Sequence, residues 1–178
     1  NYLHTHKENP QHARKLLAEN TAYTNLLIPF APSKNLVQWA QVPFETNPFH
    51  PERKIHIAPG NIRVRSKSEV LIATLLYTNH IPFRYECALQ IGGRTIYPDF
   101  TIRHPQTGEF YYWEHFGKMD DPEYQKHAFD KIQLYTKNGI QPHIRLIITT
   151  ETATNPLSIH TIECRIQEFF PLEHANPA

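Results

Sequence analysis

Six of the 15 prolines in this 178-residue chain lie in the stretch Pro29–Pro59. Proline fixes φ and cannot donate a backbone hydrogen bond, so such a stretch suits neither a helix interior nor a central strand. We therefore predict an irregular, proline-rich arm here, anchored on the main body by Trp39, Phe44 and Phe49. A regular fold has to be built largely from the residues that follow.

The chain divides near Gly60 into two parts of different character. Asn9 followed by Pro10 is typical of an N-cap and the first helical position, and predicts a polar helix that ends near Leu27. This helix and the arm form the expected N-terminal part, residues 1–60. Residues 61–178 form the expected main domain.

The main domain shows a regular alternation of helix and strand patterns. Helices are predicted where Ser66, Asp121-Pro122 and Ser158 supply N-terminal caps. A Gly92-Gly93 pair predicts a hairpin between two strands. In chain order we predict a helix over 66–79, strands over 83–91, 95–103 and 109–116, a helix over 121–139, a strand over 144–150 and a helix over 158–170. This order predicts an α/β fold with helices on both faces of a mixed sheet.

Composition and charge exclude several classes of protein. Lys plus Arg number 18 and Asp plus Glu 17, so the net charge of +1 does not itself indicate a nucleic-acid partner. No run approaches the roughly 20 apolar residues of a membrane span, and because no charged stretch followed by an apolar segment is visible near Asn1, we expect no signal peptide. The P-loop, GxGxxG, HExxH and GxSxG motifs are absent. We expect a cytoplasmic protein in which Cys87 and Cys164 are buried free thiols. Because the chain begins at Asn1, it is compatible with being part of a longer protein.

Three acidic residues lie where acids are not expected. Glu69 is in the first turn of a buried helix, Asp99 lies within the second predicted strand, and Glu114 is near the end of the third. Strand interiors disfavour acids, and two neighbouring acids on adjacent strands repel each other. A divalent cation that binds both carboxylates removes this repulsion. The three acids together therefore indicate a metal site.

Each acid also has a purely structural interpretation. Glu69 follows Ser66 by three residues, which is the spacing of a capping box. Asp99 can be a solvent-facing acid after a bulge caused by Pro98. Glu114 can be the partner of an arginine on a neighbouring strand. The residues alone leave these alternatives open.

The acids and their neighbours resemble the PD-(D/E)XK nuclease superfamily, which includes many restriction endonucleases. The resemblance covers about residues 65–150 and is closest to a bacterial branch of the superfamily. It rests on three segments: Arg65-Ser-Lys-Ser-Glu69, Tyr97-Pro-Asp-Phe100 and Trp113-Glu-His-Phe-Gly117. It implies a restriction-endonuclease-like α-β-β-β-α-β core, in agreement with the predicted order of elements. It also implies metal-dependent hydrolysis of phosphodiester bonds, in DNA rather than RNA.

The resemblance further implies a site that binds one or two Mg²⁺ or Mn²⁺ ions. Its ligands would be three carboxylates and one backbone carbonyl: Glu69, Asp99, Glu114 and the carbonyl of His115. The bound metal would lower the pKa of a water molecule and shield the phosphate. The His115 side chain alternates to the other face of its strand, and we expect a structural role for it.

One position departs from the superfamily pattern. A lysine is expected two residues after the second acid, where this chain has Phe116. Lys131, at the edge of the apolar stripe of the following helix, is the best replacement, although a surface lysine is an equal alternative. The departure also supports an alternative function, a catalytically inactive domain of the same fold that binds nucleic acid or a protein partner.

A basic stretch precedes the helix that carries Glu69. Arg63, Arg65 and Lys67 recur at a spacing of two, so in an extended segment they share one face. We predict that they bind the phosphate backbone of DNA, with a solvated charge cluster as the alternative. Double-strand cleavage by this fold often involves two copies, so a homodimer is one expected assembly.

Overall fold

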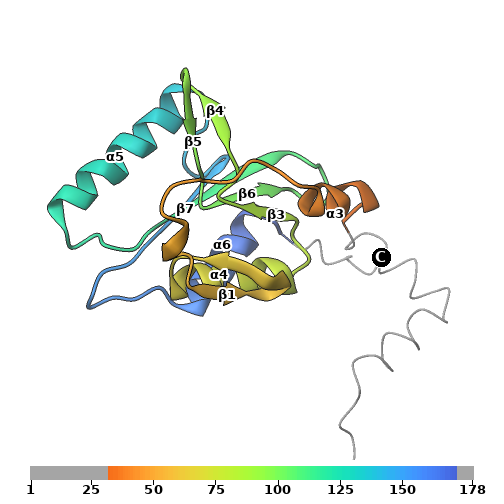
Figure 1. Ribbon diagram of the computed structural model, residues 1–178, viewed down its shortest axis with the longest axis horizontal. Helices are drawn as coiled ribbons and strands as arrows, with labels where there is room; N and C mark the ends of the chain where they lie inside the picture. Colours follow the sequence, from red (N-terminus) through yellow and green to blue (C-terminus); the bar gives the residue numbers. More distant parts are fainter. Residues whose placement is uncertain (1–31, 172–178) are drawn as a thin grey trace, which may run out of the picture. The chain divides into compact units, whose positions relative to one another are not determined.

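A four-stranded mixed sheet runs through the part of the chain that the structure, a computed structural model, describes, residues 32–171 (Figure 1). Its strands lie in the order β3-β6-β7-β8, with bounds Phe83–Tyr85, Phe100–Arg103, Phe110–Phe116 and Leu146–Thr150. The first three are antiparallel, and β8 runs parallel to β7 after a crossover through helix α5 (Pro122–Lys137). The predicted α/β class with a mixed sheet is therefore confirmed. The helix predicted to end near Leu27 lies outside the described residues.

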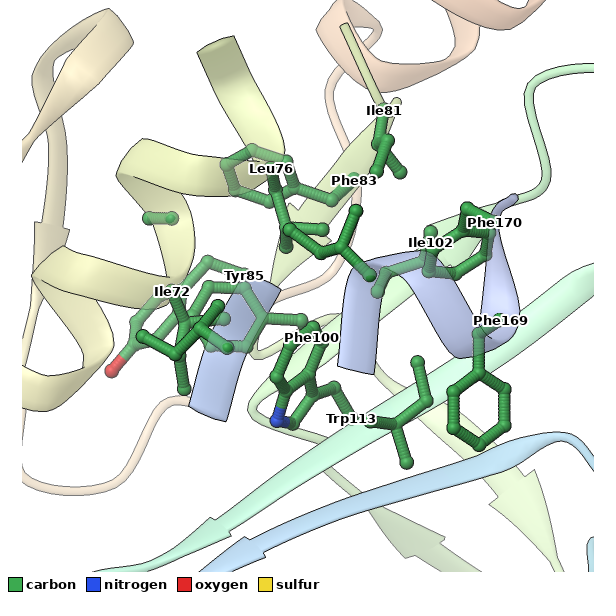
Figure 2. Close-up of a cluster of buried hydrophobic side chains, with 14 of the residues drawn as sticks. Ile72, Leu76, Ile81, Phe83, Tyr85, Phe100, Ile102, Trp113, Phe169 and Phe170 are labelled. Atoms are coloured by element: carbon green, nitrogen blue, oxygen red, sulfur yellow. The ribbon is translucent and has the colours of Figure 1, made fainter. Parts of the chain in front are cut away.

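Helices α4 (Lys67–Thr78) and α6 (Ile159–Phe169) cover one face of this sheet. Both begin at their predicted caps, because the hydroxyls of Ser66 and Ser158 accept hydrogen bonds from backbone amides three residues later. Burial of each large apolar side chain in the core contributes about 1.5–3 kcal/mol. Figure 2 shows the core that they close: Ile72, Leu76, Phe83, Phe100, Trp113 and Phe169.

Helix α5 covers the opposite face of the sheet. Neighbouring side chains in a strand point to opposite faces, so Tyr112 points away from the core that contains Trp113. There Tyr112 packs in a second apolar cluster with Tyr135 of α5. A separate two-stranded ribbon contributes to this cluster, and its tight turn confirms the predicted Gly-Gly hairpin. The ribbon strands are β4 (Leu89–Ile91) and β5 (Arg94–Ile96).

The prediction of two continuous strands over 83–91 and 95–103 is wrong. Each is broken in the middle, so that β3 and β6 join the main sheet and β4 and β5 form the ribbon. The first break occurs at Glu86, whose φ of 46° is incompatible with a strand. The second occurs at Pro98, which cannot donate a ladder hydrogen bond. Asp99 therefore lies immediately before β6 rather than inside a strand.

The proline-rich arm is more regular than predicted. Helix α3 (Lys34–Gln41) lies between Pro32 and Pro43, which both fall outside it, and Ser33 caps its first turn. The prediction of an irregular arm is therefore wrong here, because eight residues free of proline suffice for two helical turns. Three aromatic contacts join the arm to the main body, as predicted: Trp39 with Phe110 (5.9 Å between ring centroids), Phe44 with the guanidinium of Arg84 (4.6 Å) and Phe49 with Tyr97 (6.4 Å).

A short hairpin links the arm to α4. Its strands β1 (His56–Ala58) and β2 (Ile62–Val64) pair antiparallel, and one-turn 3₁₀ helices cover Pro51–Arg53 and Pro59–Asn61. Gly60 has a φ of 77° in the turn between the paired strands. The division into residues 1–60 and 61–178 stays a prediction.

Two simpler expectations can be compared with the described residues. None of the helices within residues 32–171 has the length and apolar character needed to cross a membrane. Both cysteines are free thiols, as predicted. However, Cys164 is exposed on α6 and Cys87 is only half-buried, so the expectation that both thiols are buried is wrong.

Candidate active site

Asp99 and Glu114 face each other across adjacent strands. Phe100 pairs with Trp113 in the β6–β7 ladder, and continuing this antiparallel register by one residue places Asp99 opposite Glu114. Directly opposite residues have Cβ atoms about 4.5–5.5 Å apart. The backbone amide of His115 donates a hydrogen bond to Asp99 Oδ2 (2.7 Å). The two acids are therefore neighbours, as the sequence predicts, and Glu114 is only 1% exposed.

Lys131 provides the positive charge of this site. Its Nζ lies 2.7 Å from Glu114 Oε2 and donates a second hydrogen bond to the carbonyl of Tyr97 (3.2 Å). Helix α5 carries the lysine onto the same face of the sheet as Glu114. The candidate lysine predicted from the sequence is thus in contact with the candidate acid. The alternative of an arginine partner for Glu114 is wrong, because the partner is this lysine.

Two tyrosines of α5 also belong to the site, and sequence reasoning missed them. The hydroxyl of Tyr135 donates a hydrogen bond to Glu114 Oε1 (2.6 Å), and the hydroxyl of Tyr124 accepts one from the amide of Gly117 (3.3 Å). In the sequence both tyrosines belong to an apolar stripe. The signal that could have revealed Tyr135 is its spacing of four residues from Lys131, which places both side chains on one helix face.

Burial and charge shift the pKa values of these groups. Burial raises the pKa of Glu114 to about 7, with Lys131 opposing the shift and Asp99 adding to it. Burial also raises the pKa of Asp99, while the charge of Lys131 opposes the shift. For Lys131, burial alone would lower the pKa, but Glu114 and Asp99 outweigh it and raise the pKa. The site therefore holds two carboxylates in an environment that disfavours two negative charges.

Glu69 closes the N-terminus of α4. Its Oε2 accepts hydrogen bonds from the amides of Arg65 (2.7 Å) and Ser66 (3.1 Å) and from the hydroxyl of Tyr85 (2.8 Å). The predicted capping box is present. Burial, and secondly the charge of Asp99, raise the pKa of Glu69 to about 7. Glu69 therefore lies within the electrostatic reach of the site, but one of its oxygens is committed to the helix cap.

The donor set fits a metal bound by two carboxylates better than one bound by three. Among residues 32–171, no three His, Cys, Asp or Glu side chains are grouped so as to hold a metal ion. Mg²⁺ commonly binds through one or two carboxylates and retains several waters. Asp99 and Glu114 supply such a pair, and Asp99 Oδ1 accepts no hydrogen bond from the described residues. Participation of Glu69 and of the His115 carbonyl stays a prediction.

The side chain of His115 lies on the opposite face of β7 and is buried. Its Nδ1 is 3.0 Å from Thr149 Oγ1, and its Nε2 is 3.2 Å from Glu151 Oε1. Glu151 in turn accepts a hydrogen bond from Ser68 near the start of α4 (2.9 Å). The imidazole thus links β7, the end of β8 and α4, which agrees with the expected structural role.

The basic stretch separates into two kinds of residue. Arg63 and Lys67 are exposed. Arg65 is instead turned inward, with its Nε 2.6 Å from Glu86 Oε1 and its Nη atoms donating to the carbonyls of Phe49 and His50. Only the two exposed residues of this stretch present free cationic groups at the surface.

Comparison of the chain with protein-family models, with curated proteins and with solved structures found no match. The functional argument therefore rests on the geometry around Asp99, Glu114 and Lys131.

Proposed function

We propose that this protein is a metal-dependent nuclease that hydrolyses phosphodiester bonds in DNA. One observation carries the proposal: Asp99 Oδ2 accepts a hydrogen bond from the amide of His115, the residue after Glu114, and Lys131 Nζ lies 2.7 Å from Glu114 Oε2. Two adjacent carboxylates and one amine are the groups that hold a divalent cation and a phosphate. Their raised pKa values support a functional site, because such shifts are concentrated where chemistry takes place.

The order of elements supports a restriction-endonuclease-like topology. Along the chain the main sheet and its helices follow the order α4, β3, β6, β7, α5 and β8. This is the α-β-β-β-α-β order that the resemblance to PD-(D/E)XK nucleases implies. We include this finer assignment of the fold in the proposal.

The roles of the residues follow from their positions. Asp99 and Glu114 would hold Mg²⁺ or Mn²⁺, with Glu69 and the carbonyl of His115 as further candidate ligands. The bound ion supplies a water of lowered pKa and neutralises charge on the phosphate. Lys131 replaces the lysine that the superfamily pattern places at Phe116. Its ammonium group balances the charge of Glu114, and the lysine side chain is 29% exposed, which leaves it partly accessible to a phosphate oxygen.

The proposal extends to the binding partners and the cellular setting of the protein. Arg63 and Lys67 would bind the DNA backbone, and Arg65 would act by supporting the arm rather than by contacting phosphate directly. A homodimer would supply two sites for double-strand cleavage. The cytoplasm of a bacterial cell is the proposed setting.

Cleavage of supercoiled plasmid in Mn²⁺ tests the proposal directly. We expect the wild-type chain to nick or linearise the plasmid, and Glu114→Gln and Asp99→Asn to reduce this to background. Lys131→Met should lower the rate by about 100-fold or more, the range for a positioned charged group. Glu123→Gln, which changes an exposed acid in the first turn of α5, is the matched control and should cleave normally. Equal cleavage by wild type and Glu114→Gln would show that the activity comes from a contaminating nuclease.

A second candidate function is an inactive domain of this fold that binds nucleic acid or a protein partner. The observation in its favour is that both oxygens of Glu114 are already occupied, by Lys131 and by Tyr135. Thermal melting in Mn²⁺ separates the two candidates, since a ligand that binds only the folded state raises Tm. A Tm unaffected by Mn²⁺, together with no cleavage, would favour the inactive domain.

A further inference from the structure

An exposed aromatic ring stands beside the candidate site. The side chain of Phe49, in the arm, is 64% exposed and packs edge-on against the half-buried Tyr97, with 6.4 Å between ring centroids. A single exposed apolar residue needs no explanation by itself. Two features of Phe49 do need an explanation: the hydrogen-bonded backbone that supports it, and its position near the candidate site.

Hydrogen bonds fix the backbone on both sides of Phe49. Its amide donates to Asn47 Oδ1 (2.9 Å), and its carbonyl accepts from Arg65 Nη2 (2.6 Å). A second nitrogen of the same guanidinium donates to the carbonyl of His50 (2.9 Å). The backbone that carries the exposed ring is therefore held in place, and the ring rests against Tyr97 without being packed into the core, which lowers the entropic cost of binding a partner.

The support for the ring is a buried ionic network. Glu86 is 4% exposed and binds both Arg65 (2.6 Å) and Lys54 (2.7 Å). Its φ of 46° is unusual for a residue other than glycine. Its backbone amide donates to the carbonyl of Asp99 (3.0 Å). The network that holds Phe49 is thus hydrogen-bonded to the backbone of a candidate metal ligand.

Tyr97 links the aromatic pair to the candidate site through its backbone. Its carbonyl accepts a hydrogen bond from Lys131 Nζ (3.2 Å), and the same nitrogen lies 2.7 Å from Glu114. Tyr97 is also only two residues from Asp99. A nucleotide whose phosphate sits at Lys131 and Asp99 would therefore carry its base close to the two rings.

We propose that Phe49 and Tyr97 form a stacking platform for an unpaired base next to the scissile phosphate, so that the substrate is single-stranded at the site. This inference rests on the proposed nuclease function. Bases stack on aromatic side chains regardless of sequence, whereas a base inside a duplex has both faces covered by its neighbours. The platform selects for single strands, flaps or frayed ends, and it sets no sequence preference.

Binding without cleavage tests this inference. The probe is an oligonucleotide with one 2-aminopurine, used as a single strand and as a blunt duplex, in EDTA. The wild type should bind the single strand more tightly and change the 2-aminopurine fluorescence. Phe49→Ala should weaken single-strand binding by about tenfold, and Phe49→Trp should retain it. Phe129→Ala, which removes another exposed ring (58% exposed) on α5, should have no effect.

The outcomes separate this inference from the proposed function. If the plasmid is cleaved but Phe49→Ala binds the single strand as the wild type does, the platform is wrong and the nuclease stands. If Phe49→Ala weakens single-strand and duplex binding equally, the platform is also wrong. If the aromatic variants bind as expected and no DNA is cleaved, the stacking platform is supported, but it belongs to a catalytically inactive domain. A wild type that binds neither probe would overturn the platform. Unchanged thermal melting of Phe49→Ala confirms that the variant is folded.

Discussion

Arg65 lies in a basic run of the sequence, but its guanidinium faces the interior. It shares the buried Glu86 with Lys54 and donates to two carbonyls of the arm. A cation in this position stabilises the fold, because a buried carboxylate without sufficient compensation is strongly destabilising.

Arg65→Ala should therefore destabilise the protein. We expect a loss of about 2–4 kcal/mol in the free energy of unfolding, since Lys54 alone remains to balance Glu86. Arg63→Ala, at an exposed position in the same run, should change it by less than about 0.5 kcal/mol. Urea denaturation of the two variants measures the difference. Equal stability of both would show that the buried network contributes little. Tests of DNA binding by the basic stretch should accordingly use Arg63 and Lys67.

At the scale of single residues, the sequence predicts which residues belong to the candidate site, but it does not predict all of their contacts. Asp99 and Glu114 are predicted from their places in the expected strands, and Lys131 from the resemblance and its place at the edge of the helix stripe. The structure brings all three together. Tyr135 was missed because a tyrosine in an apolar stripe has the pattern of a core residue. Only the path of α5 over β7 shows that its hydroxyl reaches Glu114. The inward turn of Arg65 was equally hidden, because it depends on an arm distant in sequence.

At the scale of elements, α5 is the part that completes the candidate site. One face of this helix supplies both hydrogen-bond partners of Glu114, Lys131 and Tyr135, at a spacing of four residues. The two contacts are chemically different, since the lysine brings a charge and the tyrosine a neutral donor.

Tyr135→Phe should separate these two contributions. The variant keeps the ring in its apolar cluster and removes only the donor to Glu114 Oε1. At about pH 8, where Glu114 is mostly ionised, we expect a loss of about 1.5–3 kcal/mol in the free energy of unfolding, the range for a hydrogen bond to a charged group. Chemical denaturation measures this loss, and Tyr77→Phe, on the exposed side of α4, provides the control that should show none. A stable Tyr135→Phe would indicate that water readily replaces the hydroxyl.

The elements themselves were predicted where local signals agree. Serine and Asp-Pro caps located α4, α5 and α6, because capping is a local interaction between side chain and backbone. Helix α3 was missed because its flanking prolines suggested irregular structure throughout the arm. The break at Glu86 was missed because it follows from a positive φ and from pairing with the arm, where Thr46 forms an isolated bridge with Cys87. The break at Pro98 was missed because the alternation of apolar residues continues across the proline.

At the scale of the whole molecule, the buried acids link stability to pH. The pKa of Glu114 is about 7 in the folded state, against an ordinary value of 4.5. Between these values the folded protein retains a proton that the unfolded chain releases. The resulting stabilisation is complete below pH 4.5 and is lost as the pH rises through 7. Glu69, whose pKa is also raised to about 7, contributes in the same direction.

We therefore expect stability to fall between about pH 6.5 and 8 in metal-free buffer. The expected loss from Glu114 alone is on the order of 1 kcal/mol. Starting at pH 6.5 limits the contribution of His104, whose pKa is lowered by burial and whose titration acts in the opposite direction. Urea denaturation at several pH values measures the slope. Glu114→Gln should reduce it and leave the part due to Glu69, whereas Glu123→Gln should not change it. If stability falls with pH as steeply in Glu114→Gln as in the wild type, the pH dependence comes from groups other than Glu114.

The position of Lys131 on the crossover helix also determines where the chain tolerates changes in length. Each residue added inside α5 before Lys131 rotates the lysine by about 100° around the helix axis, because an α-helix has 3.6 residues per turn. A single insertion between Asp121 and Lys131 would therefore turn the Lys131 ammonium group and the Tyr135 hydroxyl together away from β7 and leave Glu114 buried without either partner. The turn of residues 117–120, which precedes the cap, can absorb the same insertion without such a rotation. Natural variation in length is accordingly expected in this turn and not in the first ten residues of the helix.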